Sequence, residues 1–421
     1  QDKKHQVKKS DDYDPYCNRE VIHPTTNAET LLHFLKGSLG TGILAMPKAF
    51  DNAGYAVGLA GTLSIGILCT YCIHLLVKSE YELCKRRKVP ALSYPATAES
   101  ALREGPICFR HVINVSLLIY QLGACGVYVV FIAKNLKSVI VDARIYMLIL
   151  LLPLILINWI RNLKFLAPFS TFANAITFVS FGIIVYYLFR DPLDFVDRAP
   201  VGSVSNFPLF FGTVLFALEA IGVILPLENE MKSPKSFVST FGVLNIGMSC
   251  VIFLYLGMGF FGYIRYGSLV QGSITLNLPD EVLAKVVQVL LALGIYVTHA
   301  VMAYVAIDIT WREYLGPVLE KNSHRLVWEY VMRTGLVIFT FLLGVAIPEL
   351  ELFISLIGAL SLSGLGLAFP AIIHTCAFWS VTTRNEKIIM VAKNASVVAL
   401  GVLGLVAGTY TSLREIIKTF T

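Results

Sequence analysis

Long apolar segments recur along the whole of this chain. Each holds about 20 mostly apolar residues, the length that an α-helix needs to cross a hydrocarbon core roughly 30 Å thick. Charged or Gly/Pro-rich stretches separate them. Such a pattern predicts an all-α integral membrane protein with eleven transmembrane helices. The expected spans cover residues 28–47, 56–78, 111–136, 145–162, 167–189, 208–227, 237–263, 282–308, 329–347, 351–377 and 388–410.

The composition excludes an ordinary soluble protein. Only 15% of the 421 residues are charged, against roughly 25% in soluble domains, and the mean hydropathy is +0.69. An integral membrane enzyme is also disfavoured, because the sequence has no HExxH motif, nucleophile elbow or paired-carboxylate site. We expect no cofactor and no metal. The net charge of +6 needs no nucleic acid partner to explain it.

Lys and Arg gather on one side of the expected spans. The N-terminal segment and the loops after the even-numbered spans hold most of them, including the run Lys85, Arg86, Arg87 and Lys88. Positive residues favour the cytosolic side of a membrane protein. We therefore expect a cytosolic N-terminus and an exofacial or lumenal C-terminus.

The charge pattern also divides the chain. Half of the first twenty residues are charged, a composition typical of disorder. The sequence predicts a disordered cytosolic tail over residues 1–25, a transmembrane domain over 26–410 and a short exofacial or lumenal tail over 411–421.

Glycine interrupts the first expected span. Thr26 and Glu29 have the spacing of a capping box, so a helix is expected to begin near Asn27. It then meets Gly37-Ser38-Leu39-Gly40-Thr41-Gly42, where three glycines in six residues disfavour a helix. Backbone freed at membrane depth is tolerated where it lines a cavity or is buried in protein. The alternative is close helix packing through small residues.

The sixth expected span contains a second interruption. Its sequence Phe216-Ala217-Leu218-Glu219-Ala220-Ile221-Gly222 places a carboxylate and a glycine in mid-span, and Pro226 follows. Two broken helices about 180 residues apart, each opening a block of five spans with one span left over, indicate a 5+5 inverted repeat plus one extra helix. A binding site is then expected between the breaks, at the bilayer midplane.

A site between two such breaks suits a zwitterion. Freed N–H groups at the start of a half-helix attract a carboxylate, and we assign this role to Gly40, Thr41 and Gly42. Freed carbonyls near Phe216 to Glu219 are expected to accept from an ammonium group. Further candidate contacts lie at the same breaks and in the third span, namely Gly37, Ser38, Gly222 and Gln121.

Ionisable residues inside a span are costly in lipid and indicate function by default. His33 shares a helical face with Gly37 and Gly40, and a histidine titrates near neutral pH. Glu219 can bind an ammonium group, carry a proton, or hydrogen-bond the broken backbone in its protonated form. We predict proton coupling by His33 and Glu219, with a neutral, hydrogen-bonded histidine as the alternative for His33. His299, in the eighth span, is better explained by packing.

Several motifs then occur in an order typical of one family. They include Leu32-His33-Phe34-Leu35-Lys36-Gly37, Gly40-Thr41-Gly42, Gln121-Leu122-Gly123, Ile160-Arg161-Asn162-Leu163, Phe210-Phe211-Gly212-Thr213, Leu225-Pro226-Leu227-Glu228-Asn229 and Gln271-Gly272-Ser273-Ile274-Thr275-Leu276-Asn277-Leu278-Pro279. From about Thr30 to Tyr410 the chain resembles the proton-coupled amino acid transporters of solute carrier family 36, in the amino acid/auxin permease group.

The resemblance implies a LeuT-like fold of eleven spans and symport of small neutral amino acids, such as glycine, alanine or proline, with a proton as coupling ion. It also implies that His33 matches the family histidine associated with proton coupling. Two other functions stay open. A sodium-coupled carrier would hold Na⁺ with freed carbonyls and hydroxyls, and an amino acid sensor would signal through a cytosolic partner of the charged tail. Plasma, lysosomal and late endosomal membranes all remain candidate locations.

Overall fold

The computed structural model describes residues 13–21, 24–38, 40–102, 108–137, 143–161, 165–218 and 221–420. Most of these residues are helical, and within them the only β pairing is one isolated parallel bridge between Thr25 and Met231. The expectation of an all-α protein is therefore confirmed.

Helices occupy each of the expected spans. They are α1 (Asn27–Ser38) and α2 (Thr41–Ala53), α3 (Tyr55–Arg87), α5 (Cys108–Lys137), α6 (Ala143–Asn158), α7 (Ala167–Phe189), α8 (Phe207–Ala217) and α9 (Ile221–Asn229), α10 (Val243–Tyr266), α11 (Val282–Ile309), α13 (Arg325–Ala346), α14 (Leu350–Ile357) with the π-helix Gly358–Ala368 and α15 (Phe369–Phe378), and α16 (Arg384–Phe420). The short helices α4 (Tyr94–Ala101) and α12 (Gly316–Val318) lie in connections.

Eight of the described helical segments are long and apolar enough to cross a membrane. The first, fourth and sixth expected spans fall outside this set. The first and sixth are each divided into two shorter helices, as the sequence predicted, and α6 has only 16 residues. The division follows local chemistry, because glycine-rich or polar sequence interrupts both spans.

The start of α1 has the capping box expected from its sequence. The backbone N–H of Thr26 donates to Glu29 Oε2 at 2.8 Å, and the backbone N–H of Glu29 donates to Thr26 Oγ1 at 3.3 Å. These reciprocal bonds satisfy two donors that the first turn of a helix leaves free. The predicted start at Asn27 is thereby confirmed.

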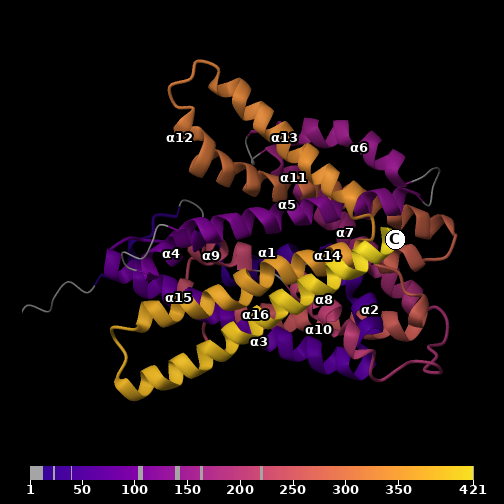
Figure 1. Ribbon diagram of the computed structural model, residues 1–421, viewed down its shortest axis with the longest axis horizontal. Helices are drawn as coiled ribbons and strands as arrows, with labels where there is room; N and C mark the ends of the chain where they lie inside the picture. Colours follow the sequence, from indigo (N-terminus) through magenta and orange to yellow (C-terminus); the bar gives the residue numbers. More distant parts are fainter. Residues whose placement is uncertain are drawn as a thin grey trace, which may run out of the picture.

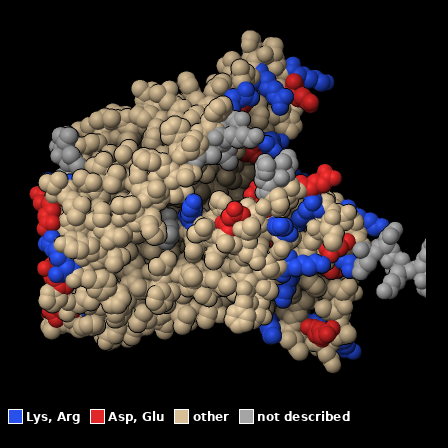
Figure 2. All heavy atoms as spheres, turned by 180° about the vertical axis from the view of Figure 1, so that it is seen from behind, with Lys and Arg blue, Asp and Glu red and all other residues tan. Residues whose placement is uncertain are grey.

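The long helices run roughly along one axis of the molecule (Figure 1). Figure 2 shows Lys, Arg, Asp and Glu concentrated at the two ends of the molecule, with few of them on the broad face between. A bilayer-spanning protein needs this distribution, because a charged side chain at the bilayer centre is costly. The multi-pass integral membrane architecture expected from the sequence agrees with it.

Small residues bring α8 into backbone contact with its neighbours. A Cβ atom on Gly212 would lie 2.3 Å from the carbonyl oxygen of Ser355, and a Cβ on Gly358 would lie 1.9 Å from the carbonyl oxygen of Gly212. Both distances are too short for any side chain. The close approach fixes α8 against α14 and the π-helix, and so positions the end of α8.

Both ends of the chain differ from the sequence expectation. Residues 13–21 belong to the expected disordered tail, yet they contain a short 3₁₀-helix at Pro15–Asn18 and a buried Arg19. Distant carboxylates pair with Arg19, and a local composition rule does not register them. Residues 1–12 lie outside the described part of the chain. At the other end, α16 continues to Phe420 through most of the expected tail 411–421.

Candidate functional site

The two interrupted spans meet at their breaks. The first break lies between Ser38, the last residue of α1, and Thr41, the first of α2, while the second lies between Ala217 and Ile221. A Cβ atom on Gly42 would lie only 2.6 Å from the Cα atom of Ala217. The first turn of α2 therefore touches the last turn of α8.

The start of α2 offers backbone hydrogen-bond donors. The first N–H groups of a helix have no intrahelical partner, and the N-cap residue Gly40, whose backbone is extended, offers no side-chain acceptor. The side chain of Thr41 is 2% exposed, and within the described residues its hydroxyl has no hydrogen-bond partner. Backbone donors and a positive helix dipole make such a terminus an anion site. The arrangement can bind a carboxylate.

The end of α1 is held by a tyrosine from α10. The hydroxyl of Tyr255, a fully buried residue, donates to the carbonyl oxygen of Ser38. The Ser38 hydroxyl donates to the carbonyl of Phe34 at 3.0 Å within its own helix. The predicted substrate contact Ser38 therefore has both of its oxygen atoms engaged within the protein. Sequence reasoning missed Tyr255, because a tyrosine in an apolar span follows no recognisable pattern.

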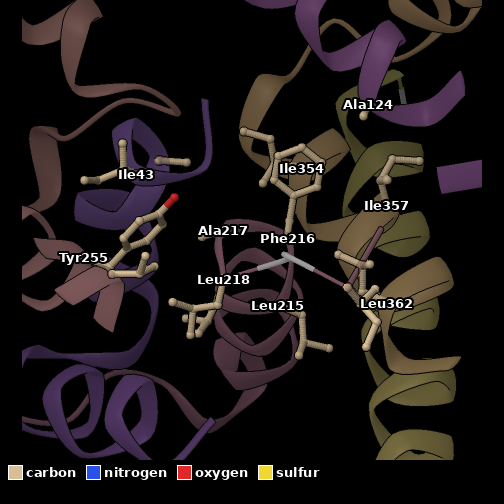
Figure 3. Packing of buried hydrophobic residues seen from close by; sticks show 14 of the residues in the cluster. Ile43, Ala124, Leu215, Phe216, Ala217, Leu218, Tyr255, Ile354, Ile357 and Leu362 are labelled. Carbon is tan, nitrogen blue, oxygen red and sulfur yellow. The ribbon is translucent and has the colours of Figure 1, made fainter. Parts of the chain in front are cut away.

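Aromatic and aliphatic side chains pack around Phe216 and Ala217 at the end of α8. Figure 3 shows Tyr255 on one side of Phe216 and Ala217, Ile357 and Leu362 on the other, and Ile354 beside the Phe216 ring. The Phe216 ring lies 6.5 Å, between centroids, from the ring of Tyr120 on α5.

The third-span candidate Gln121 follows Tyr120 on α5. Its side chain is 5% exposed, and its Oε1 atom has no hydrogen-bond partner within the described residues. A buried amide oxygen without a partner can accept a hydrogen bond from a ligand or from water.

The proton-coupling candidate His33 lies on an exposed face of α1 together with Gly37. Lys36, on the same helix, lines a cavity of about 400 Å³ with residues of α7 that include Asn174 and Thr177. His33 is thus placed in the helix that leads to the first break, on a side not covered by protein.

The remaining candidate residues are Glu219, Gly222 and His299. Glu219 lies outside the described residues, and Gly222 is exposed in the first turn of α9. His299 is fully buried in α11, with its Nδ1 atom 3.4 Å from Nδ2 of Asn158 on α6. This is the packed arrangement that the sequence favoured. Within the described residues, no group of three or more His, Cys, Asp or Glu is arranged to hold a metal ion.

The family follows from comparison with known sequences. Residues 23–414 match the family model described as transmembrane amino acid transporter protein. The chain belongs to this transporter family. The transporter is 40% identical, over 97% of its length and 89% of the relative's, to "Proton-coupled amino acid transporter-like protein pathetic" of Drosophila melanogaster. It is 28% identical, over 97% of its length and 93% of the relative's, to "Probable amino acid transporter skat-1" of Caenorhabditis elegans. The resemblance to proton-coupled amino acid transporters is confirmed.

Solved structures support the fold of this transporter. The inward-facing conformation of Mhp1 superposes with a TM-score of 0.60 at 12% identity, covering 96% of this chain and 92% of Mhp1. The closed conformation of Mhp1, a nucleobase-cation-symport-1 family transporter with bromovinylhydantoin bound, gives a TM-score of 0.51 at 14% identity, covering 98% and 96%. The LeuT-like fold predicted from the sequence is shared with these structures. The family and the fold are those of transporters, in agreement with the expectation of a non-enzyme.

Proposed function

We propose that this transporter is a secondary active symporter that moves small neutral amino acids together with protons by alternating access. The observation that carries the proposal is the contact between Gly42 and Ala217. It places the unpaired donors of α2 beside the end of α8, where carbonyl groups at the end of a helix also lack intrahelical partners. One break then binds the carboxylate and the other binds the ammonium group of the same ligand.

Close packing at the two breaks supports a preference for substrates with small side chains. Gly42 and Ala217 leave no space between α2 and α8, while Phe216 packs on Tyr120 beyond them. Each added methylene that cannot be accommodated costs about 1–3 kcal/mol of discrimination. Glycine, alanine and proline are the proposed substrates.

Proton coupling is assigned to His33, with Glu219 as a second candidate. The His33 side chain is exposed on α1, so it is not enclosed by the rest of the protein. A proton drives uptake only if its binding free energy differs between the two transport conformations. The printed name of the Drosophila relative, which includes proton coupling, supports this choice of ion.

The proposed topology has eleven spans, with the N-terminus in the cytosol and the C-terminus exofacial or lumenal. It rests on the Lys and Arg distribution and on the helices found in all the expected spans. Protease treatment of sealed cells that carry terminal epitope tags tests the orientation. Cleavage of the N-terminal tag from outside contradicts it. Imaging of the same cells assigns the plasma membrane or the lysosomal and late endosomal membranes.

The decisive experiment for function is uptake of labelled alanine into proteoliposomes under an imposed pH gradient without sodium. The proposal expects concentrative uptake that collapses when a protonophore removes the gradient. Uptake that is absent under these conditions and restored by a sodium gradient would establish the sodium-coupled alternative. Glu219→Gln, measured in the same assay, separates charge from shape. Unchanged substrate affinity and proton coupling would remove Glu219 from the mechanism.

A further inference from the structure

Arg19 is buried between two carboxylates from different helices. Its Nη2 atom lies 3.0 Å from Glu228 Oε2 and 3.8 Å from Glu80 Oε2, and the three side chains are 5%, 0% and 0% exposed. Arg19 belongs to the N-terminal segment, Glu80 to α3 and Glu228 to the last turn of α9. The guanidinium group therefore connects three parts of the chain that are far apart in sequence.

Further contacts fix the orientation of the Arg19 side chain. Its Nε atom donates to the carbonyl oxygen of Pro90 at 3.0 Å, and its Nη1 atom donates to the carbonyl oxygen of Glu228 at 3.2 Å. The guanidinium carbon lies 4.7 Å from the centre of the Tyr16 ring. A cation that binds a carbonyl in the last turn of a helix also interacts favourably with the helix dipole. Arg19 thus stabilises the end of α9.

The chain on either side of Arg19 is attached to the same region. Asp14 pairs with Lys235 at 2.9 Å. The backbone N–H of Thr25 donates to the carbonyl of Glu230 at 2.9 Å, and that of Lys232 donates to the carbonyl of Thr25 at 2.9 Å. The next residue after Thr25 begins the capping box of α1. The N-terminal segment therefore joins the end of α9 to the start of α1, and these two half-helices also pack against each other.

Arg19 supplies the positive charge that two buried carboxylates share. Two buried carboxylates, Glu80 and Glu228, share one guanidinium group. The other titratable groups in the cluster are the Tyr16 phenol and the Cys84 thiol, which lies 3.0 Å from Glu80 Oε1. Burial raises the pKa of the Tyr16 phenol, and the nearby Glu228 carboxylate raises it further. The phenol therefore stays neutral. Removing one partner of a buried ion pair is strongly destabilising, because the remaining charge is left uncompensated.

We propose that Arg19 is a positioning residue that locks α9 onto α3 and thereby holds the half-helix that follows the second break. Its effect on transport rests on the proposed function, whereas the locking itself does not. Loss of Arg19 leaves two buried negative charges close together, and binding of a proton by either carboxylate relieves their repulsion. The defect of an Arg19→Ala protein should therefore be larger at neutral pH than at acidic pH.

Cys84 provides a native reporter of the lock, because it is fully buried against Glu80. The test measures the rate of N-ethylmaleimide addition at Cys84 in the purified full-length protein, by mass spectrometry at pH 7.5 and pH 5.5. Cys72, also fully buried in α3, is the internal control. We expect Arg19→Ala to raise the Cys84 rate over wild type roughly tenfold at pH 7.5, a factor that corresponds to about 1.4 kcal/mol of easier opening. At pH 5.5 the ratio should fall toward one, with Cys72 unchanged throughout.

Variants that restore part of the charge balance distinguish a positioning role of Arg19 from general destabilisation of the protein. The double variant Arg19→Ala/Glu228→Gln leaves one unpaired carboxylate instead of two, so its Cys84 rate at pH 7.5 should return toward wild type. Arg19→Lys keeps the charge without the planar fork and should lie between wild type and Arg19→Ala. Equal rates in Arg19→Ala and wild type at pH 7.5, or a double variant as reactive as Arg19→Ala, would overturn the proposal.

The matched control is the ion pair between Asp14 of the same segment and Lys235, whose side chains are 25% and 69% exposed. The hydrogen bond from Lys235 lowers the pKa of Asp14 below its ordinary value, which is about 4. A lowered carboxyl pKa gives stability that is present above the ordinary value and lost only as the pH falls through the lowered one. Asp14 is therefore ionised at both test pH values. Lys235→Ala should leave the Cys84 rate near wild type at both pH values. A large increase at pH 7.5 would show that any loosening of the N-terminal segment exposes Cys84, whether or not Arg19 is present.

Transport is measured in the same variants as a second readout. Arg19→Ala should lower alanine uptake when the liposome interior and bath are both near neutral pH before the gradient is imposed, and Arg19→Ala/Glu228→Gln should recover part of it. If no protein, wild type included, transports alanine while the Cys84 pattern holds, the proposed function fails and the lock stands. If transport is intact in Arg19→Ala with a raised Cys84 rate, the positioning role is refuted.

Discussion

Gly42 of α2 lies against the main chain of Ala217 of α8, so closely that a Cβ atom at Gly42 would sit 2.6 Å from the Ala217 Cα and 3.1 Å from its Cβ. The obstructing atom is backbone and cannot move by a change of rotamer. The contact joins the first turn of one half-helix to the last turn of the other. Its tightness determines how the two breaks face a ligand.

Gly42→Ala should abolish amino acid uptake, because α2 and α8 must separate to admit the new methyl group. Ala217→Gly should not rescue it, since the nearest obstructing atom is the Cα of residue 217. Gly335→Ala on α13 is the matched control, with no atom within 4 Å of the added Cβ. Uptake and surface expression are measured together. Normal uptake by Gly42→Ala would show that the breaks tolerate separation.

Thr41→Val should weaken substrate binding with little change in protein stability. The Thr41 hydroxyl is buried and has no hydrogen-bond partner within the described residues. One hydrogen bond to a charged ligand contributes about 1.5–3 kcal/mol, so KM should rise by roughly tenfold or more. Thr41→Ser keeps the hydroxyl and should stay near wild type. Equal KM values for the two variants would exclude the hydroxyl from substrate binding.

Tyr255→Phe should destabilise the folded protein even without substrate. It leaves the Ser38 carbonyl, at the end of α1, without the donor that now binds it. An unsatisfied buried polar group costs about 1–3 kcal/mol, and the thermal midpoint of the purified protein should fall accordingly. Tyr410→Phe, at a residue that is 66% exposed, is the control. Identical midpoints for both variants would show that the Ser38 carbonyl finds another partner.

His33→Gln and His33→Ala should uncouple uptake from the pH gradient without impairing folding. His33 is exposed on α1 and contributes little burial, so surface expression should be normal. Substrate exchange between equal concentrations should persist, while accumulation against a gradient should be lost. Exchange and accumulation are compared in the same proteoliposomes. Full proton-driven accumulation in both variants would assign coupling to another group.

Local chemistry explains which features could be predicted from the sequence. The capping box of Thr26 and Glu29 and the glycines before Gly42 act within a few residues, so their effect is visible in a short window. Hydropathy located the spans because burial in lipid requires about 20 apolar residues. It placed the end of α3 near residue 78, whereas the helix continues to Arg87. Charged residues are compatible with a helix outside the bilayer, and an apolar window does not register them.

Long-range pairing explains what could not be predicted. Tyr255 is separated from Ser38 by 217 residues, and Arg19 from Glu228 by 209. No periodicity links such residues, and a charged segment with buried partners has the composition of a disordered one. The contact of Ala217 with Gly42 could not be predicted either, because alanine is common in membrane spans and nothing in the local sequence indicates which helix it packs against.

The burial of Arg19 also constrains the order of events during synthesis and membrane insertion. Arg19 leaves the ribosome 209 residues before Glu228, so the guanidinium group must stay hydrated while the intervening helices enter the membrane. Its second carboxylate arrives only with α9, after the sixth span has been inserted. The N-terminal segment can therefore close over both α3 and α9 only after the sixth expected span has been synthesised. A chain truncated before α9 would keep the contacts of Arg19 with Glu80 and Pro90 but lose both contacts with Glu228.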